Sequence, residues 1–310
     1  MSDKLNKNIL ATIAYYNGLN YPLTAFEIWK NLIRTDYYDN NQPAQITLAE
    51  IIKQLHGDSL KTYIENENGF YFLKGEKHLV ERRIKNNKIS VEKINKLVRT
   101  AKWLRFIPFV KMIGMTGALA MKNANVKSDL DILMVFKNGK IWTGRTLATL
   151  FLHVIGKRRH DKKIIDRVCL NFFVTDESLE IITKDLFSAS EYMFLFPLYG
   201  RETYERFQIK NQWIKSMKPN YALCEIQPLK TLEDSHLTKI VRTIGEVVLS
   251  ADWIENSLRK IEKKRIMQNP KTHQEGSMVY ADDNALVFLP DPHGPKVFEQ
   301  FKEKIEQSSI

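Results

Sequence analysis

The 310-residue sequence is poor in cysteine and has no long hydrophobic run. Its two cysteines, Cys169 and Cys224, belong to no CxxC pair and have no histidine at metal-ligand spacing, so neither a disulfide framework nor a zinc site is expected. No apolar run approaches the roughly 20 residues that span a bilayer, and the N-terminal segment MSDKLNKNIL lacks the apolar core of a signal peptide. We therefore expect a cytoplasmic protein with no membrane partner.

Acidic residues are too few to balance the basic ones. There are 36 Asp and Glu residues against 47 Lys and Arg, which gives a formal charge of +11. This surplus favours a polyanionic partner such as nucleic acid. Hydrophobic residues make up 44% of the chain, which excludes a disordered or collagen-like protein. The length indicates two or three domains.

Two segments of the N-terminal third begin with the same helix-start signal. Thr24–Glu27 and Thr47–Glu50 each place a threonine three residues before a glutamate, which is the pattern of a capping box. The pair Asn68-Gly69, between two apolar runs, predicts a hairpin turn. Three helices followed by a hairpin are typical of a winged helix, so residues 1–77 are expected to form a winged-helix-like domain.

The third helix expected in this domain carries little positive charge. Its sequence, TLAEIIKQLHGD, has Lys53 as its only cation, whereas phosphate contacts need a face of Arg and Lys. We therefore expect this domain to dock against other parts of a structure more readily than to recognise a DNA sequence.

The densest positive stretch of the chain is expected to form one basic linker helix over residues 78–106. Apolar residues at helical spacing indicate that one face packs while another projects charge. Contact with an RNA or DNA backbone is one interpretation, and a solvated surface is the other. The basic residues of this helix are Arg82, Arg83, Lys85, Lys88, Lys93, Lys96, Arg99, Lys102 and Arg105.

Two aspartates, Asp129 and Asp131, stand two residues apart at the start of an apolar strand pattern. A turn at Thr116-Gly117 ends the preceding apolar strand. Because side chains alternate along a strand, both carboxylates point to the same face. Like charges on one face of an apolar strand repel each other, and a divalent cation removes that cost. A strand edge at which both acids face water is the alternative.

This run resembles the signature of the nucleotidyltransferase superfamily, which includes DNA polymerase beta and the antibiotic and tRNA nucleotidyltransferases. That signature is an apolar strand, Gly-Ser, a spacer, Ser-Asp-x-Asp and a second apolar strand, and here it covers residues 113–135. The resemblance implies that Asp129 and Asp131 are catalytic residues that hold Mg²⁺ or Mn²⁺. It also implies that a nucleoside triphosphate binds at the Gly turn, where backbone N–H groups attract phosphate. The residues implied at that nucleotide site are Thr116, Gly117, Ala118 and Ser128.

Two positions depart from the family pattern. Ala118 stands where the family usually has Ser, which removes one hydroxyl contact to a phosphate. The third family carboxylate is expected on the strand 167–174, RVCLNFFV, whose central polar residue is Asn171. Alternation places Asn171 on one face with Cys169, and we expect it at the third catalytic position, with Asp166 as the alternative. Asparagine can bind a metal through its carbonyl oxygen but cannot act as a base.

These observations predict an α/β (α+β) protein. A nucleotidyltransferase core with a mixed sheet is expected over 107–185, and a mainly helical domain over 186–310. The basic stretch 157–163 is a further candidate for gripping a triphosphate or a polynucleotide, with a solvated loop as the alternative.

The predicted function is transfer of a nucleoside monophosphate from a triphosphate to a hydroxyl acceptor, with release of pyrophosphate. The basic stretches favour an RNA or DNA end as the acceptor. One alternative is a catalytically degenerate nucleic-acid-binding or regulatory protein that keeps the fold. The other is a transferase that acts on a protein or small-molecule hydroxyl.

Overall fold

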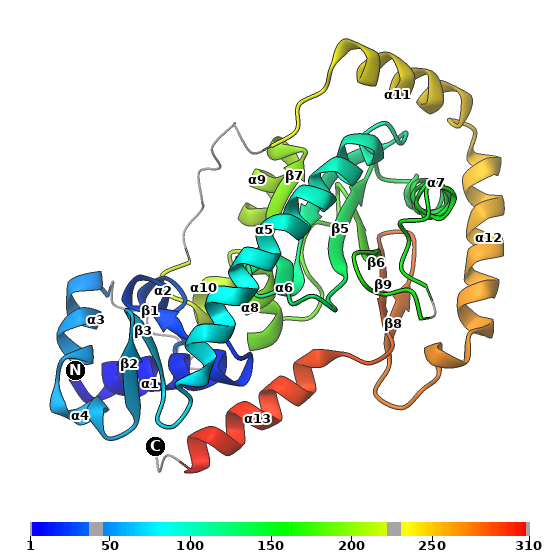
Figure 1. The fold of residues 1–310 in the computed structure, drawn as a ribbon. Coiled ribbons are helices and arrows are strands. Elements are labelled where there is room, and N and C mark those ends of the chain that lie inside the picture. The colour runs from blue at the N-terminus through cyan, green and yellow to red at the C-terminus, as the bar shows by residue number, and fades with distance from the viewer. Residues whose placement is uncertain (1, 37–45, 161, 222–230, 308–310) are drawn as a thin grey trace.

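The computed structural model describes residues 2–36, 46–160, 162–221 and 231–307. These residues form a mixed fold of helices and strands with two β-sheets (Figure 1). The mixed α/β class predicted from the sequence is therefore confirmed. Cys224 lies outside the described residues, as does Asp161 within the basic stretch 157–163.

The N-terminal part of the chain combines a small antiparallel sheet, of order β1-β3-β2, with four helices. Its elements are α1 (Ser2–Gly18), β1 (Leu23–Thr24), α2 (Ala25–Lys30), α3 (Leu48–Leu55), α4 (Asp58–Lys61), β2 (Ile64–Glu67) and β3 (Phe70–Leu73).

Local sequence signals account for the boundaries of these elements. Both predicted capping boxes are present, at the start of α2 and of α3, with the backbone N–H of Glu27 and of Glu50 donating to the threonine hydroxyl. The predicted hairpin joins β2 to β3 through Asn68 and Gly69, whose φ angles are 51° and 79°. Positive φ at both positions matches the right-handed twist of the two strands.

The rest of the chain is built around a six-stranded sheet of order β7-β4-β5-β6-β9-β8. The pair β5 and β6 is parallel, and the other neighbouring pairs are antiparallel. The elements are α5 (His78–Leu104), β4 (Val110–Met115), α6 (Gly117–Ala120), β5 (Leu130–Phe136), α7 (Ile141–Val154), β6 (Val168–Thr175), α8 (Leu186–Met193), β7 (Phe196–Tyr199), α9 (Arg201–Lys210), α10 (Ile214–Met217), α11 (His236–Val248), α12 (Asp252–Gln268), a 3₁₀ turn (Pro270–Thr272), β8 (Met278–Ala281), β9 (Ala285–Leu289) and α13 (His293–Gln307).

Half of the strands in this sheet come from residues after 185, a region that the sequence pattern assigned to a mainly helical domain. Strand β7 forms one edge of the sheet, β8 forms the other, and β9 lies between β6 and β8. The helices of the same region are α8 to α13. Short strands such as Phe196–Tyr199 carry too few residues for a clear alternating pattern, because their pairing depends on a partner far away in sequence.

The central strand β5 is buried on both faces. Ile132 and Met134 pack in one apolar cluster with residues of α5 and α7. Leu133 and Val135 pack in another, with residues of α8, α9 and α10. Asp131 has the parity of the second set, so its side chain lies on the α8 side of the sheet.

The C-terminal helix α13 returns to the N-terminal part of the fold and packs against α1 (Figure 1). The rings of Tyr15 and Phe301 meet edge to face with centroids 5.5 Å apart. Nearby, the buried ammonium of Lys218 donates hydrogen bonds to Tyr16 Oη at 3.1 Å and to the Asn31 carbonyl at 3.3 Å. The small sheet and its helices therefore share packed interfaces with the C-terminal region.

Candidate metal centre

The Gly turn after β4 lies directly against the second aspartate. Gly117 has a φ of +64°, and a Cβ atom built on it would lie 2.8 Å from Asp131 Oδ2. Thr116 donates a backbone hydrogen bond of 3.1 Å to the carbonyl oxygen of Asp131. Only glycine combines this backbone conformation with this close approach, so the turn and the aspartate form one unit.

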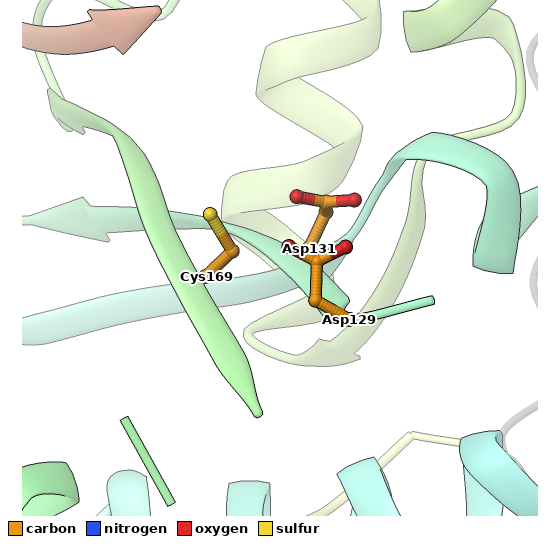
Figure 2. A group of neighbouring side chains, drawn as sticks. All are labelled: Asp129, Asp131 and Cys169. Carbon is orange, nitrogen blue, oxygen red and sulfur yellow. The ribbon is translucent and has the colours of Figure 1, made fainter. Parts of the chain in front are cut away.

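Asp129 and the thiol of Cys169 lie next to Asp131 and form a cluster with it. The ligand atoms of Asp129, Asp131 and Cys169 all lie within 4.8 Å of one another (Figure 2). Asp131 on β5 is paired with Cys169 on the parallel strand β6, which puts both side chains on the same face of the sheet. Both aspartates were predicted from the sequence, whereas Cys169 was not, although it lies in the strand expected to supply the third ligand.

A bulge explains why simple alternation along β6 is a poor guide. The register passes from Ile132 opposite Leu170 to Leu133 opposite Phe172, so Asn171 is an extra residue with no partner on β5. The half-buried Asn171 therefore interrupts the strict alternation on which its assignment to the third catalytic position was based. That assignment stays a prediction.

The alternative third acid, Asp166, is engaged elsewhere. Its carboxylate accepts a hydrogen bond of 2.7 Å from Lys93 and one of 2.6 Å from Lys96, both on α5. Burial alone would raise the pKa of Asp166, but the two lysines outweigh it and hold that pKa below its ordinary value. Asp166 thus fixes α5 to the segment before β6.

An arginine from the basic stretch reaches the cluster. Arg159 Nη1 donates a hydrogen bond of 2.6 Å to Asp129 Oδ2 and lies 3.3 Å from Cys169 Sγ. Its side chain is half-exposed, whereas that of Asp129 is largely covered. From the sequence, this stretch was a candidate for gripping a triphosphate or a polynucleotide, with a solvated loop as the alternative. In the structure, Arg159 contacts the carboxylate of Asp129.

The electrostatics of the cluster favour a bound cation. Burial first, and then the charge of Asp129, raise the pKa of Asp131 from 3.8 to about 7, although Arg159 and Cys169 oppose this increase. Burial and the same aspartates raise the pKa of the Cys169 thiol to about 12. A divalent cation would reverse both trends, because it stabilises carboxylate and thiolate together.

A further acid on the same side of the sheet was missed by sequence reasoning. Glu191 lies on α8, and burial followed by the charges of Asp131 and Asp185 raises its pKa to about 7. It is the only acidic residue in the helix segment LFSASEYM, whose first turn is capped by Asp185. The sequence signal for Glu191 was a single acid among apolar and small residues. Nothing nearby in the sequence links Glu191 to Asp131, which lies some 60 residues earlier.

The other residues predicted for nucleotide binding lie around the turn. Thr116 is buried, Ala118 is exposed, and α6, which they begin, is a single four-residue turn. The hydroxyl of Ser128 accepts a hydrogen bond of 3.0 Å from the backbone N–H of Asn125. Ser128 therefore shapes the loop that leads into Asp129.

The loop before Asp129 is held by one face of the basic helix α5. Arg83, Asn86, Ser90 and Lys93, spaced by three, four and three residues, are all buried. In that order they donate side-chain hydrogen bonds to the backbone carbonyls of residues 121, 123, 124 and 126, and Lys93 also reaches the carbonyl of Ser128 at 2.8 Å. Two of the basic residues of this helix, Arg83 and Lys93, thus face inward and hold the loop that leads to Asp129.

Comparisons with protein-family models, curated proteins and solved structures found no match to this chain. None of the helices in the described residues is long and apolar enough to cross a membrane. The interpretation of the centre therefore depends on its own geometry and chemistry.

Proposed function

We propose that the chain is a divalent-metal-dependent nucleotidyltransferase that uses Mg²⁺ or Mn²⁺ and a nucleoside triphosphate. The observation that carries this proposal is the pair of Asp129, directly before the buried strand β5, and Asp131 within it, whose ligand atoms lie within 4.8 Å of each other. Asp131 also lies against a glycine turn that has no room for a side chain. A purely structural role would not favour two neighbouring carboxylates, one of them with a strongly raised pKa.

The donor set fits a divalent cation. Two carboxylates and a thiol have ligand atoms within 4.8 Å of one another, and oxygen ligands suit Mg²⁺ and Mn²⁺. Asp129 and Asp131 would hold the metal, with Cys169 beside them. When bound, such an ion supplies charge neutralisation for the phosphates and for the attacking oxygen.

In the proposed reaction, a hydroxyl oxygen of the acceptor forms a bond to the α-phosphorus of the triphosphate. The bond from that phosphorus to pyrophosphate breaks, and the proton of the hydroxyl is released. Gly117 lets the backbone of the turn approach Asp131. Thr116, Gly117, Ala118 and Ser128 would bind the nucleotide. Arg159 is placed to contact an anion beside Asp129.

The finer layout belongs to the same proposal. Residues 1–77 would serve as a winged-helix-like domain, 78–106 as a basic linker helix, 107–185 as the catalytic core and 186–310 as a mainly helical domain that contributes strands to its sheet. We further propose a cytoplasmic protein whose acceptor is an RNA or DNA end, in keeping with the net charge of +11.

A transfer assay tests this function. Purified protein is incubated with Mg²⁺ or Mn²⁺, each α-labelled nucleoside triphosphate in turn, and pooled RNA, DNA or cell extract, and the labelled product is followed. Asp129→Asn and Asp131→Asn should each abolish transfer, while Asp58→Asn, at an exposed acid paired with Lys61, should not change it. Normal transfer by a protein with both Asp129→Asn and Asp131→Asn would disprove the role of the pair.

A second function is favoured by two observations at the same centre. Cys169 lies where a third carboxylate would complete the set, and Arg159 already neutralises Asp129. These features suit a nucleic-acid-binding or regulatory protein that keeps the fold without turnover. Metal binding without transfer to any acceptor, under conditions in which polynucleotide binds, would favour this second function.

A further inference from the structure

A groove lies between the C-terminal half of α5 and the end of α7, on the face of the sheet that these two helices cover. It encloses about 480 Å³, and its walls are made by Lys96, Arg99 and Trp103 of α5, by Phe151 of α7 and by Lys157 of the following loop.

The lining of this groove combines flat aromatic surface with positive charge. The side chain of Trp103 is 62% exposed, which is unusual for a large aromatic residue. Every charged residue that lines the groove is a cation. Among the described residues, the side chains of Arg99 and Lys157 have no hydrogen-bond or ion-pair partner. The groove is thus equipped for a ligand that carries both a stacking face and negative charge.

The groove is joined to the acidic pair by a short stretch of backbone. Lys157 and Arg159 are two residues apart, which is about 7 Å of extended chain. The backbone of Val168 at the start of β6 holds both residues, donating to the Lys157 carbonyl at 2.7 Å and accepting from the Arg159 N–H at 2.9 Å. Arg159 in turn contacts Asp129. A strand seated in the groove, on the α5 and α7 side of the sheet, would have to pass the segment from Lys157 to Arg159 to bring its end to Asp131 on the α8 side.

We propose that this groove binds the acceptor of the reaction, a single-stranded polynucleotide, with a base stacked on Trp103 and phosphates paired with Arg99 and Lys157. A nucleobase offers a π-face to the indole while its flanking phosphates neutralise the cations. An acidic peptide would satisfy the cations but leave the indole exposed. This inference rests on the proposed function for its catalytic meaning, but the binding itself does not require turnover.

The basic residues of α5 do not all have the same surroundings. In the N-terminal half of α5, Arg83 is buried against Glu27 and Tyr21, and Arg82 hydrogen-bonds to Asn20. These contacts tie that half of the helix to the N-terminal part of the fold. The polynucleotide site is therefore assigned to the C-terminal half of the same helix.

Direct binding in EDTA, in which no transfer occurs, tests the site. Fluorescence anisotropy with labelled single-stranded RNA and DNA oligonucleotides of the same sequence shows whether the bound strand is RNA or DNA. A labelled poly-glutamate peptide tests whether an acidic protein segment binds instead.

Trp103→Ala should weaken strand binding by about tenfold. Arg99→Gln combined with Lys157→Gln should lower the slope of log affinity against log salt by about 1.4, because two fewer counterions are released. Trp253→Ala and Lys88→Gln, at exposed positions outside the groove, should change neither quantity.

The possible outcomes separate this inference from the proposed function. Strand binding that is unaffected by Trp103→Ala, no strand binding at low salt, or equal binding of the acidic peptide would each overturn the groove assignment. Groove-dependent binding together with normal transfer by the Asp129→Asn, Asp131→Asn double variant would disprove the proposed metal chemistry and leave the groove intact. Because the side chain of Trp103 is exposed, we expect Trp103→Ala to keep the fold, and circular dichroism checks this.

Discussion

The guanidinium of Arg159 donates a hydrogen bond of 2.6 Å to Asp129 Oδ2 at the edge of the acidic cluster. The same nitrogen lies 3.3 Å from Cys169 Sγ. An internal cation therefore partly neutralises the carboxylates that we propose as metal ligands. Binding of a metal must compete with this ion pair, and that competition can be measured.

Arg159→Gln should tighten divalent metal binding in the absence of nucleotide. Loss of a partly exposed ion pair is worth about 1 kcal/mol or less, so we expect Mn²⁺ affinity to rise by about two- to fivefold. Isothermal titration calorimetry measures the change, and Lys162→Gln, an exposed cation of the same loop, is the control. Weaker Mn²⁺ binding by Arg159→Gln would mean that the arginine supports the site instead of competing for it.

Asp131 should make the metal-free protein less stable as the pH rises. Its pKa is raised from 3.8 to about 7, mainly by burial and then by Asp129, so the folded protein binds this proton more tightly than the unfolded chain does. The stabilising contribution is fully present below pH 3.8 and is lost as the pH rises through about 7.

The variant Asp131→Asn isolates this effect from other titrating groups. The free energy of unfolding of the wild type, relative to the variant, should fall by up to about 3 kcal/mol between pH 4 and pH 8. Urea unfolding at several pH values measures it. In excess Mn²⁺, stabilisation of the wild type should instead grow with pH, because the metal binds the ionised carboxylate. A pH-independent difference in EDTA would contradict the raised pKa.

Cys169 should set the metal preference of the centre. A thiol is a softer ligand than a carboxylate, so transfer should be faster with Mn²⁺ than with Mg²⁺. Cys169→Asp would supply a third carboxylate and should raise Mg²⁺ affinity about tenfold, which corresponds to 1.4 kcal/mol. The parallel variant Asn171→Asp tests the assignment made from the sequence. If Asn171→Asp restores Mg²⁺ use and Cys169→Asp does not, the third position belongs to Asn171.

Lys93 should contribute strongly to stability through the loop that leads to Asp129. Its buried ammonium is bonded to the Ser128 carbonyl and to Asp166, and Lys93→Met removes both of these hydrogen bonds. Breaking a buried pair costs about 3 kcal/mol, with Lys96 still holding Asp166. Denaturant unfolding measures the loss, and Lys102→Met, exposed on the same helix, is the control. A loss of less than 1 kcal/mol would show that Lys93 is not a main support of the loop.

Sequence alone determined the features that depend on neighbouring residues. The capping boxes of Thr24 and Thr47 and the hairpin turn at Asn68-Gly69 follow from local hydrogen bonds and backbone conformation, and the structure contains all of them. The two-residue spacing of Asp129 and Asp131 at the start of β5 is also read from the sequence, and the ligand atoms of the two acids lie within 4.8 Å of each other.

Only the tertiary structure decided which distant residues complete the centre. Cys169 meets Asp131 through parallel pairing of β5 with β6, and the bulge at Asn171 cannot be read from a regular alternation. Arg159 and Glu191 approach the same cluster from a loop and from α8, through contacts that no local pattern encodes. The inward face of α5 was hidden for the same reason: a buried lysine and an exposed lysine have the same local sequence signal, and only the carbonyl groups packed against the helix distinguish them.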